Sequence, residues 1–374
     1  MPREQILTAE APQPRPSVAA TPGFAKAEGR HGKLRLDLSE YTGETPEHVL
    51  EAIRATPGEE LAAYPEYEAF TAELATYLGV EPECVCIFAG SDEGLRIIVQ
   101  SYFDAGDTGV VVTPSFPMYP LYLKLIGAHT VEVELGEKPP FAFDLAGICN
   151  ALESGAKGLF VPSPTNPTGT WVAPQTWVEL AKEFPESLIV VDEAYADFAP
   201  QALVCGGHSL GAGEPAVTRM RNLVVTGSFS KALGLAGLRI GWAVAHPSVI
   251  EVLSRVRSPY SVNAVAMRAT RALMLEPQAI SQRLAAVLEG KQRLIEGLAA
   301  LEVPTFVGEA NAVLAFVGDE AAPRIAAALK GRGILVRDVS KQPLLAGTLR
   351  ISAGLVPQVD TLLAALAEEY SGAG

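Results

Sequence analysis

Positive charge is scarce in this chain of 374 residues, which has 29 Lys and Arg against 43 Asp and Glu and a net charge of −14. A surface this acidic repels phosphate backbones and anionic lipid surfaces, so we expect no nucleic-acid or membrane partner. An anionic small substrate stays open, because the charge of a binding site is set locally.

Cysteine, histidine and long apolar runs are scarce as well. Four cysteines are too few for a disulfide framework, and Cys84 and Cys86 alternate within an apolar stretch, where we interpret them as core side chains of a strand. The five histidines lie far apart in the sequence, so no metal site is predicted. No apolar run reaches the roughly 18 residues of a membrane span, and residues 1–17 lack the apolar segment of a signal peptide. We therefore expect a soluble, cytoplasmic protein.

The composition is that of an ordinary globular protein, with 48% hydrophobic and 19% charged residues. A chain of this length predicts about two domains and can bury a large core. Residues 1–32 are rich in Pro, Ala and Gly and predict a flexible arm that is ordered only where it packs on the body of the protein. From about residue 46, helical patterns alternate with short strands that are apolar at nearly every position, which is typical of parallel strands buried on both faces. We expect these strands at residues 85–88, 109–113, 158–161, 188–191, 223–226 and 240–245.

The pattern changes after about residue 246, where long helices begin to dominate. The chain is therefore expected to form a large α/β domain with a mainly parallel sheet, followed by a smaller α+β domain. In the second part we expect helices at 247–257, 264–275, 277–300 and 357–370, and strands near 312–317, 334–336 and 348–352.

Polar residues follow several of the predicted strands, at the point where each strand ends. One segment reads Ser-Pro-Thr-Asn-Pro-Thr-Gly over residues 163–169, and a second reads Asp-Glu-Ala-Tyr over residues 192–195. A third holds Ser228, Ser230 and Lys231, continuing to Arg239, and a fourth holds Arg350. Ligands approach open parallel sheets at the carboxyl ends of the strands, so we expect these residues to build a site.

In their order, spacing and placement after strands, these segments resemble the fold-type I aminotransferases that use pyridoxal 5′-phosphate (PLP), and within them the histidinol-phosphate aminotransferases. The resemblance extends from about Leu34 to the C-terminal helix. It implies the α/β PLP-dependent transferase fold of type I. The implied division is an N-terminal arm and small-domain segment at residues 1–45, a large PLP-binding domain at 46–255 and a small C-terminal domain at 256–374.

The resemblance implies a catalytic centre of Lys231, Asp192 and Tyr195. PLP chemistry needs a lysine that bonds covalently to the cofactor and later moves a proton, and Lys231 is the candidate. It also needs a carboxylate that keeps the pyridine nitrogen protonated. Asp192 and Glu193 compete for this position, since neighbouring side chains on a strand point to opposite faces, and the resemblance favours Asp192. Tyr195 and Asn166 would hydrogen-bond the phenolate oxygen of the cofactor.

The phosphate group of PLP needs a cup of hydrogen-bond donors. Ser228, Ser230 and Arg239 offer two hydroxyls and a planar guanidinium. Ser91 is a good N-cap for a helix over residues 92–102, whose N-terminus adds backbone N–H groups and a favourable dipole. The other candidates for cofactor contacts are Gly90 and Asp92 at this helix start, Phe116 as the ring that stacks on the pyridine, with Tyr119 as the fallback, and Tyr64 reaching in from a neighbouring subunit.

The substrate side of the site is expected at four residues near the two ends of the chain. Arg350 matches the arginine that grips the anionic end of the substrate. Arg337 matches a second cation suited to a phosphate dianion, although a surface ion pair with the aspartate beside it is the alternative. Glu40 and Tyr41 lie where the N-terminal arm enters the site. In this segment Ser39 replaces the usual Asn, and the usual proline is absent.

The sequence therefore predicts a PLP-dependent aminotransferase that passes an amino group from histidinol phosphate or a related amino donor to a 2-oxo acid such as 2-oxoglutarate. The match at Tyr64 implies a homodimer. The altered segment at Ser39 keeps a second reaction open, in which a related PLP enzyme decarboxylates, eliminates from or cyclises an amino acid. A non-enzymatic ligand sensor that uses the phosphate cup is a further alternative, and it gives no role to Lys231.

Overall fold

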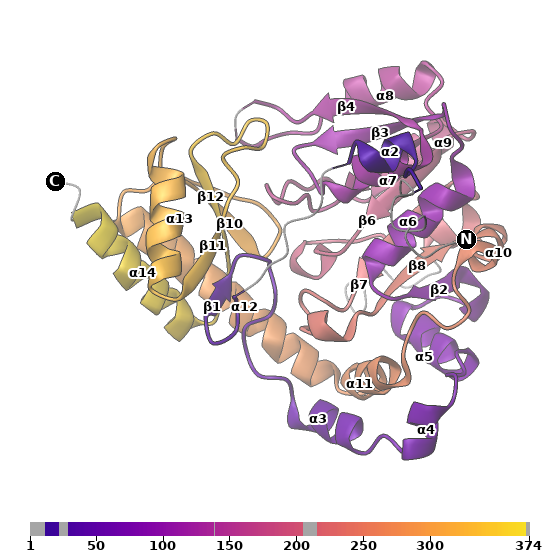
Figure 1. Ribbon diagram of the computed structural model, residues 1–374, viewed down its shortest axis with the longest axis horizontal. Helices are drawn as coiled ribbons and strands as arrows, with labels where there is room; N and C mark the ends of the chain where they lie inside the picture. The colour runs from indigo at the N-terminus through magenta and orange to yellow at the C-terminus, as the bar shows by residue number, and fades with distance from the viewer. Residues whose placement is uncertain (1–11, 22–28, 138, 205–214, 372–374) are drawn as a thin grey trace, which may run out of the picture.

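Two β-sheets organise the chain in the computed structural model, which describes residues 12–21, 29–137, 139–204 and 215–371 (Figure 1). Parts of the predicted arm, residues 1–11 and 22–28, lie outside the described residues, as do Cys205 and His208.

The larger sheet has seven strands and carries most of the predicted ones. In sheet order the strands are β2 (Val85–Phe88), β8 (Gly241–Ala245), β7 (Leu223–Ser228), β6 (Leu188–Asp192), β5 (Gly158–Pro162), β3 (Thr108–Thr113) and β4 (His129–Glu134). Neighbouring strands from β3 to β7 run parallel, while β8 is antiparallel to both β7 and β2. One strand, β4, was not predicted: its sequence alternates polar and apolar residues because it is a partly exposed edge strand.

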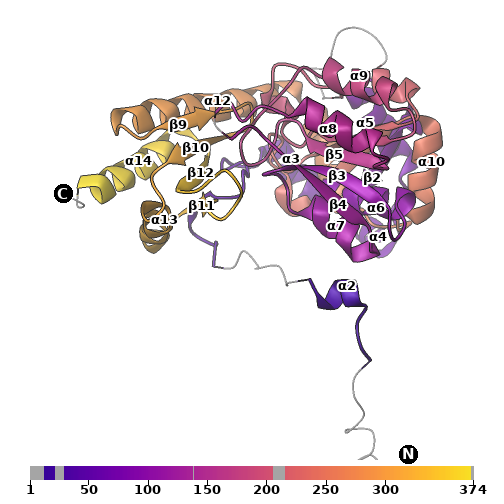
Figure 2. The same cartoon turned by 90° about the horizontal axis from the view of Figure 1, so that it is seen from above.

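Helices cover both faces of this sheet, which explains why its central strands are apolar throughout. Val110 and Val112 of β3 pack into one hydrophobic cluster, while Val111 between them packs into the other. Figure 2 shows α8 and α9 on one side of the sheet and α6 and α7 on the other. The helices of this part are α5 (Glu68–Leu78), α6 (Ser91–Tyr102), α7 (Met118–Ile126), α8 (Leu145–Glu153), α9 (Gln175–Glu183) and α10 (Pro247–Val256).

The smaller sheet joins the two ends of the chain. β1 (Leu34–Leu36) runs parallel to β11 (Ile334–Asp338), and β12 (Thr348–Ser352), β10 (Ala312–Phe316) and β9 (Thr305–Val307) follow in antiparallel order. β1 and β9 were not predicted, because three residues are too few to show a period. Three helices pack on this sheet, namely α12 (Pro277–Ala300), α13 (Ala321–Gly331) and α14 (Val356–Ser371).

α11 (Ala264–Met274) packs against α3 (Glu47–Arg54), α4 (Gly58–Ala62) and α5. From there α12 runs to the small sheet (Figure 1). The predicted domain boundary at residue 255 stays a prediction, and the contacts of α11 favour a division after it. Short 3₁₀ turns lie at Pro82–Cys84, Ala196–Phe198, Ala216–Arg219 and Ala236–Leu238.

A short helix of the N-terminal arm, α2 (Pro16–Ala19), lies against α7. The hydroxyl of Ser17 donates to the carbonyl of Leu125 at 3.2 Å, and Lys124 Nζ donates to the carbonyl of Ala20 at 2.8 Å. Within the described ranges, no helix has the length and apolar character needed to cross a membrane.

Candidate active site

A cavity of about 190 Å³ opens where β5, β6 and β7 end, beside the start of α6. Because these strands are parallel, their carboxyl ends bring three of the predicted segments to one place. The predicted residues in its wall are Ser91, Asp92, Phe116, Asn166, Asp192, Tyr195, Ser228, Ser230, Lys231 and Arg239, and they are joined by Tyr119, Pro162 and Ala194.

Asp192 ends β6 with its carboxylate buried at the cavity. Its Oδ2 accepts a hydrogen bond from the hydroxyl of Tyr119 at 2.8 Å, and its Oδ1 accepts one from the backbone N–H of Ala194 at 3.1 Å. Burial raises the pKa of Asp192, although both hydrogen bonds favour the charged form. A carboxylate in such surroundings strongly favours a cationic group placed beside it.

Glu193, the competitor of Asp192, points away from the cavity. Its Oε1 accepts from the N–H of Leu203 at 2.5 Å and its Oε2 from the N–H of Val204 at 2.9 Å. Burial raises the pKa of Glu193 to about 8, and the two N–H groups act against that shift. This carboxyl ties a following loop to the sheet, so Asp192 is the acid that faces the cavity.

A cup of cationic and hydroxyl groups lies at the start of α6. Gly90 has φ 87°, a conformation that favours glycine, and a Cβ atom there would lie 2.5 Å from Nη2 of Arg239. The missing side chain thus lets the guanidinium approach the helix N-terminus. Nη1 of Arg239 donates to Oγ of Ser230 at 3.4 Å, and the N–H of Ser230 donates to Oγ of Ser228 at 3.1 Å. This arrangement suits a phosphate group.

The expected N-cap of α6 is wrong by one residue. Gly90 is the N-cap and makes no side-chain cap, while Ser91 is the first helical residue. Glu93 accepts the N–H of Ala89 at 2.6 Å, and Ser91 belongs to the cavity wall. Asp92 accepts a hydrogen bond from the hydroxyl of Tyr122 at 2.8 Å.

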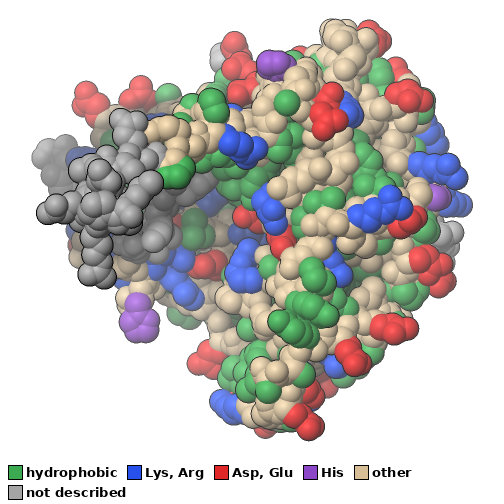
Figure 3. Space-filling view, turned by 45° about the vertical axis from the view of Figure 1, so that its right-hand side comes forward, with side chains coloured by type: hydrophobic (Ala, Val, Ile, Leu, Met, Phe, Trp, Pro, Cys, Tyr) green, Lys and Arg blue, Asp and Glu red, His purple; other side chains and the backbone are tan. Residues whose placement is uncertain are grey.

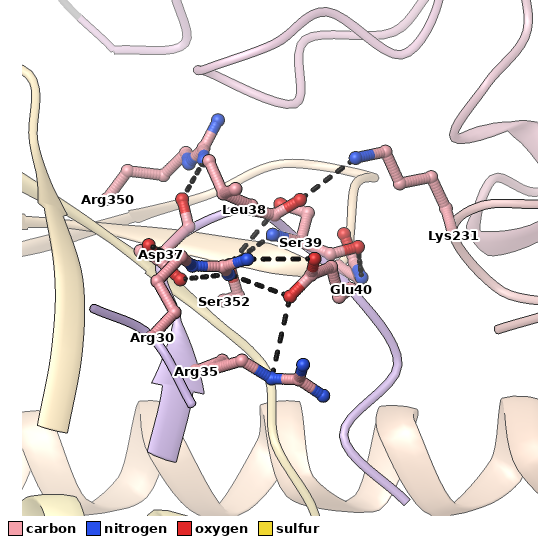
Figure 4. A network of polar contacts seen from close by, with 10 residues as sticks. Arg30, Arg35, Asp37, Leu38, Ser39, Glu40, Lys231, Arg350 and Ser352 are labelled. Atoms are coloured by element: carbon pink, nitrogen blue, oxygen red, sulfur yellow. Dashed lines mark hydrogen bonds and ion pairs between the residues drawn. The ribbon is translucent and has the colours of Figure 1, made fainter. Parts of the chain in front are cut away.

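Lys231 reaches the cavity from the segment that follows β7. Its Nζ lies 5.3 Å from the ring centre of Tyr195 and donates to the carbonyl of Leu38 at 2.9 Å (Figure 4). Burial alone would raise the pKa of Tyr195, but the positive charges of Lys231 and Arg350 lower it below its usual value. The hydroxyl of Tyr195 is therefore a stronger hydrogen-bond donor than that of an ordinary tyrosine.

Arg350 on β12 is buried beside the cavity, next to Asn166. Its Nη1 donates to Oδ1 of Asn166 and its Nη2 donates to the carbonyl of Asp37. Its buried Nε has no hydrogen-bond partner among the residues that the structure describes. Burial lowers the pKa of Arg350, and so does the charge of Arg337. A buried N–H group without a partner favours an anion that can reach it.

Arg337 lies directly opposite Arg350 in the antiparallel pair of β11 and β12, so both side chains leave the same face of the small sheet. The alternative ion pair with Asp338 does not form, since Asp338 instead accepts from the N–H and the hydroxyl of Ser340 at 2.9 and 2.6 Å. Figure 3 shows Lys and Arg side chains in the middle of one face, between the two parts of this acidic molecule.

Besides Gly90, Arg337 and Arg350, three more predicted site residues lie outside the cavity wall. Glu40 is bound by Arg30, and the ring of Tyr41 packs under the guanidinium of Arg283, 4.1 Å from its carbon atom. Tyr64 is 76% exposed and stacks on Tyr260. In a single chain, therefore, none of the three contacts the cavity.

The sequence did not reveal every group that builds the site. The hydroxyl of Tyr119 donates to Asp192, whereas the sequence offered Tyr119 only as the fallback for the ring that stacks on the pyridine. Phe116 packs edge-on against Tyr119, with the two ring centres 5.6 Å apart. The sequence signal that could have placed Tyr119 at the site was its position three residues after Phe116, on the first turn of α7. The carbonyls of Asp37 and Leu38 carry no signal of this kind, because every residue has a carbonyl.

The comparisons with known proteins agree with this geometry. A family model described as aminotransferase class I and II matches residues 31–366. A histidinol-phosphate aminotransferase from Roseiflexus castenholzii is 35% identical over 345 residues, covering 90% of this chain and 89% of the relative. The structure of histidinol-phosphate aminotransferase from Sinorhizobium meliloti in complex with PLP has a TM-score of 0.86 at 25% identity and covers 98% of this chain and 100% of its own.

Aspartate aminotransferase from Thermus thermophilus with maleate has a TM-score of 0.74 at 26% identity, covering 91% of this chain and 92% of its own. The predicted type I fold, the PLP cofactor and the aminotransferase activity are thereby confirmed, and the alternative PLP reactions are not favoured. The chain belongs to the class I and II aminotransferases, as a relative of the histidinol-phosphate aminotransferases.

Proposed function

We propose that this aminotransferase takes its amino group from histidinol phosphate and passes it to a 2-oxo acid such as 2-oxoglutarate. The observation that carries the choice of donor is the pair of Arg350 and Arg337 on one face of the small sheet. A phosphate monoester is a dianion, and two guanidinium groups match it better than they match a single carboxylate. The likeness to relatives named for that substrate supports the same donor.

The residues present fit PLP. The buried carboxylate of Asp192 suits the protonated ring nitrogen, and the cup formed by Ser228, Ser230, Arg239 and the start of α6 suits the phosphate group. When bound, PLP supplies an electron sink for the negative charge that develops at the Cα atom of the substrate.

The remaining work falls to the side chains of this protein. Lys231 is the candidate for covalent attachment and for moving a proton at Cα, because its amine is the one that reaches the cavity. Tyr195, with its lowered pKa, and Asn166 would donate hydrogen bonds to the phenolate oxygen of the ring. Phe116 would pack on the ring face.

A single-turnover absorbance experiment tests the proposed donor. Holoenzyme mixed with histidinol phosphate, without any 2-oxo acid, should convert its bound cofactor to the amine form. Histidinol, the same molecule without the phosphate, should react about 100-fold less efficiently, because it leaves two arginines without their anion.

L-Aspartate serves as the second comparison, since it is an amino donor with a carboxylate in place of the phosphate. Conversion that is equally efficient with histidinol and with histidinol phosphate would show that the arginine pair does not recognise the phosphate group. Conversion with aspartate alone would move the assignment to a different donor.

We also propose that the active form is a homodimer. Tyr64 and Leu61 are 76% and 62% exposed, and Tyr260, on which Tyr64 stacks, is 51% exposed. Large apolar side chains gathered in this way favour a protein interface. The resemblance matches Tyr64 with a residue that reaches the cofactor phosphate of a neighbouring subunit, which agrees with its distance from the cavity of its own chain.

Sedimentation equilibrium tests this assembly. The wild-type protein should show twice the chain mass of 39.5 kDa. Leu61→Asp should shift the population toward monomers, since it places a charge within the apolar surface. Leu288→Asp is the matched control, because Leu288 is an exposed leucine on α12. A monomeric wild-type protein at micromolar concentration would refute the proposal.

A further inference from the structure

A short strap of main chain, residues 37–40, lies between the side chains of Arg350 and Lys231 (Figure 4). Two of its carbonyl oxygens are engaged by site residues. That of Asp37 accepts a hydrogen bond from Nη2 of Arg350, and that of Leu38 accepts one from Nζ of Lys231 at 2.9 Å. The strap therefore contacts two of the cationic groups to which the proposed function gives a role, Arg350 and Lys231.

Arg30 holds this strap from the outside. Its Nη2 donates to Oδ1 of Asp37 and to Oε2 of Glu40, each at 2.7 Å. Its Nε and Nη1 reach the second oxygen of each carboxylate, at 3.2 and 3.1 Å. The three side chains are only 14 to 20% exposed, so water and salt screen these ion pairs less than they screen surface pairs. Arg35 approaches Glu40 only to 3.7 Å.

Ser39 holds the strap from the inside. Its N–H donates to Oγ of Ser352 at 2.9 Å, and its carbonyl accepts from Nδ2 of Asn311 at 3.2 Å. Its φ of 54° lies in the left-handed region, which costs an ordinary residue about 1 kcal/mol or more. A segment in this conformation needs restraints on both sides, and the clamp by Arg30 is the outer one.

We propose that Arg30 is a positioning residue of the active site, an inference that rests on the proposed function. Its clamp fixes the strap, and the carbonyls of Asp37 and Leu38 then orient the guanidinium of Arg350 and the amine of Lys231. With Nη1 on Asn166 and Nη2 on the strap, Arg350 keeps Nε free for the anionic end of the donor. Orientation of this kind lowers the entropic cost of binding.

A second arginine that also pairs with two carboxylates provides a control. Arg332 donates to Glu368 and Glu369 on α14 and so joins two elements of the small domain. Neither partner belongs to the cavity wall or to the strap. Arg332→Ala removes two ion pairs, as Arg30→Ala does, without touching the site.

Hydrogen–deuterium exchange and kinetics together test the clamp. In the full-length, cofactor-free protein, exchange at residues 37–40 should be at least about tenfold faster in Arg30→Ala than in the wild type, and unchanged in Arg332→Ala. In the holoenzyme, Arg30→Ala should raise KM for histidinol phosphate about tenfold and lower kcat by less than about threefold, because mainly binding is affected. Arg30→Lys should lie between these values, since an ammonium group lacks the planar fork.

The double variant Arg30→Ala/Glu40→Gln should be no worse than Arg30→Ala, because both changes remove the same contact. A further rise of KM in the double variant would mean that Glu40 contacts the substrate, and it would overturn the clamp as the role of Glu40. Unchanged exchange in Arg30→Ala, or equal KM values in Arg30→Ala and Arg332→Ala, would overturn the inference. If the wild-type enzyme does not use histidinol phosphate, the proposed donor fails, and the exchange experiment still decides whether Arg30 holds the strap.

Discussion

Lys231→Ala should lower kcat by about 10⁴-fold or more while the chain still folds. The amine of Lys231 is the group in the cavity wall that can bond to the cofactor and then move a proton, and alanine can do neither. Folding should survive, because the hydrogen bond of the amine to the carbonyl of Leu38 is not part of a core. Steady-state turnover and a thermal unfolding scan measure the two effects.

Lys157→Ala is the matched control for this loss. Lys157 pairs with Asp107 at 2.6 Å and precedes β5, at the end of the sheet opposite to the cavity, so turnover should be unchanged. Borohydride reduction of the holoenzyme adds an independent test. It should fix the cofactor covalently to the wild type and to Lys157→Ala, but not to Lys231→Ala. Wild-type turnover in Lys231→Ala would refute the assignment.

Asp192→Asn should lower kcat by about 10²- to 10³-fold with little loss of stability. An amide has nearly the shape of the carboxylate, and its oxygen can accept from the N–H of Ala194. Its NH₂ group can donate to the hydroxyl of Tyr119, which accepts as well as donates, so neither partner is left unpaired, in contrast to the two N–H groups on Glu193. The amide carries no charge, however, so it cannot hold a positive charge on the ring nitrogen in these dry surroundings. The measurements are kcat with saturating substrates and the free energy of unfolding in urea.

Glu193→Gln, one residue away, is the control with the opposite expectation. The amide has one acceptor oxygen where the carboxylate has two, so the N–H of Leu203 or of Val204 loses its partner. We expect a loss of about 1–3 kcal/mol in the free energy of unfolding and a kcat within about threefold of the wild type. If turnover instead collapses in Glu193→Gln and survives in Asp192→Asn, the two acids have exchanged roles.

The fold was predictable where the pattern of residues reports burial on both faces. Val110, Val111 and Val112 are apolar because helices cover both sides of β3. An unbroken apolar run of this kind is what predicted the parallel sheet from the sequence. The strands that escaped prediction are of another kind. β4 lies at an edge with one face in water, and β1 is so short that only its pairing with β11 makes it a strand.

The candidate site was predictable because its polar residues lie where parallel strands end, and this position is also what brings them together. Asp192 and Lys231 could be placed in this way from their segments. Contacts between distant parts of the chain could not be predicted in this way. Arg30 lies seven and ten residues from its partners, in a stretch without regular structure, and nothing in the sequence links it to Arg350.

The pairing of β1 with β11 has a consequence for the order in which the newly made chain can fold. All seven strands of the large sheet are present once Ala245 has been synthesised, so the cup and Asp192 can form early. Residues 34–36 must wait for Ile334–Asp338 before they have a neighbour, and Arg350 follows later still. The corner that is proposed to bind the donor therefore forms last, and a nascent chain that stops short of β12 has a cofactor cup without the means to select a substrate.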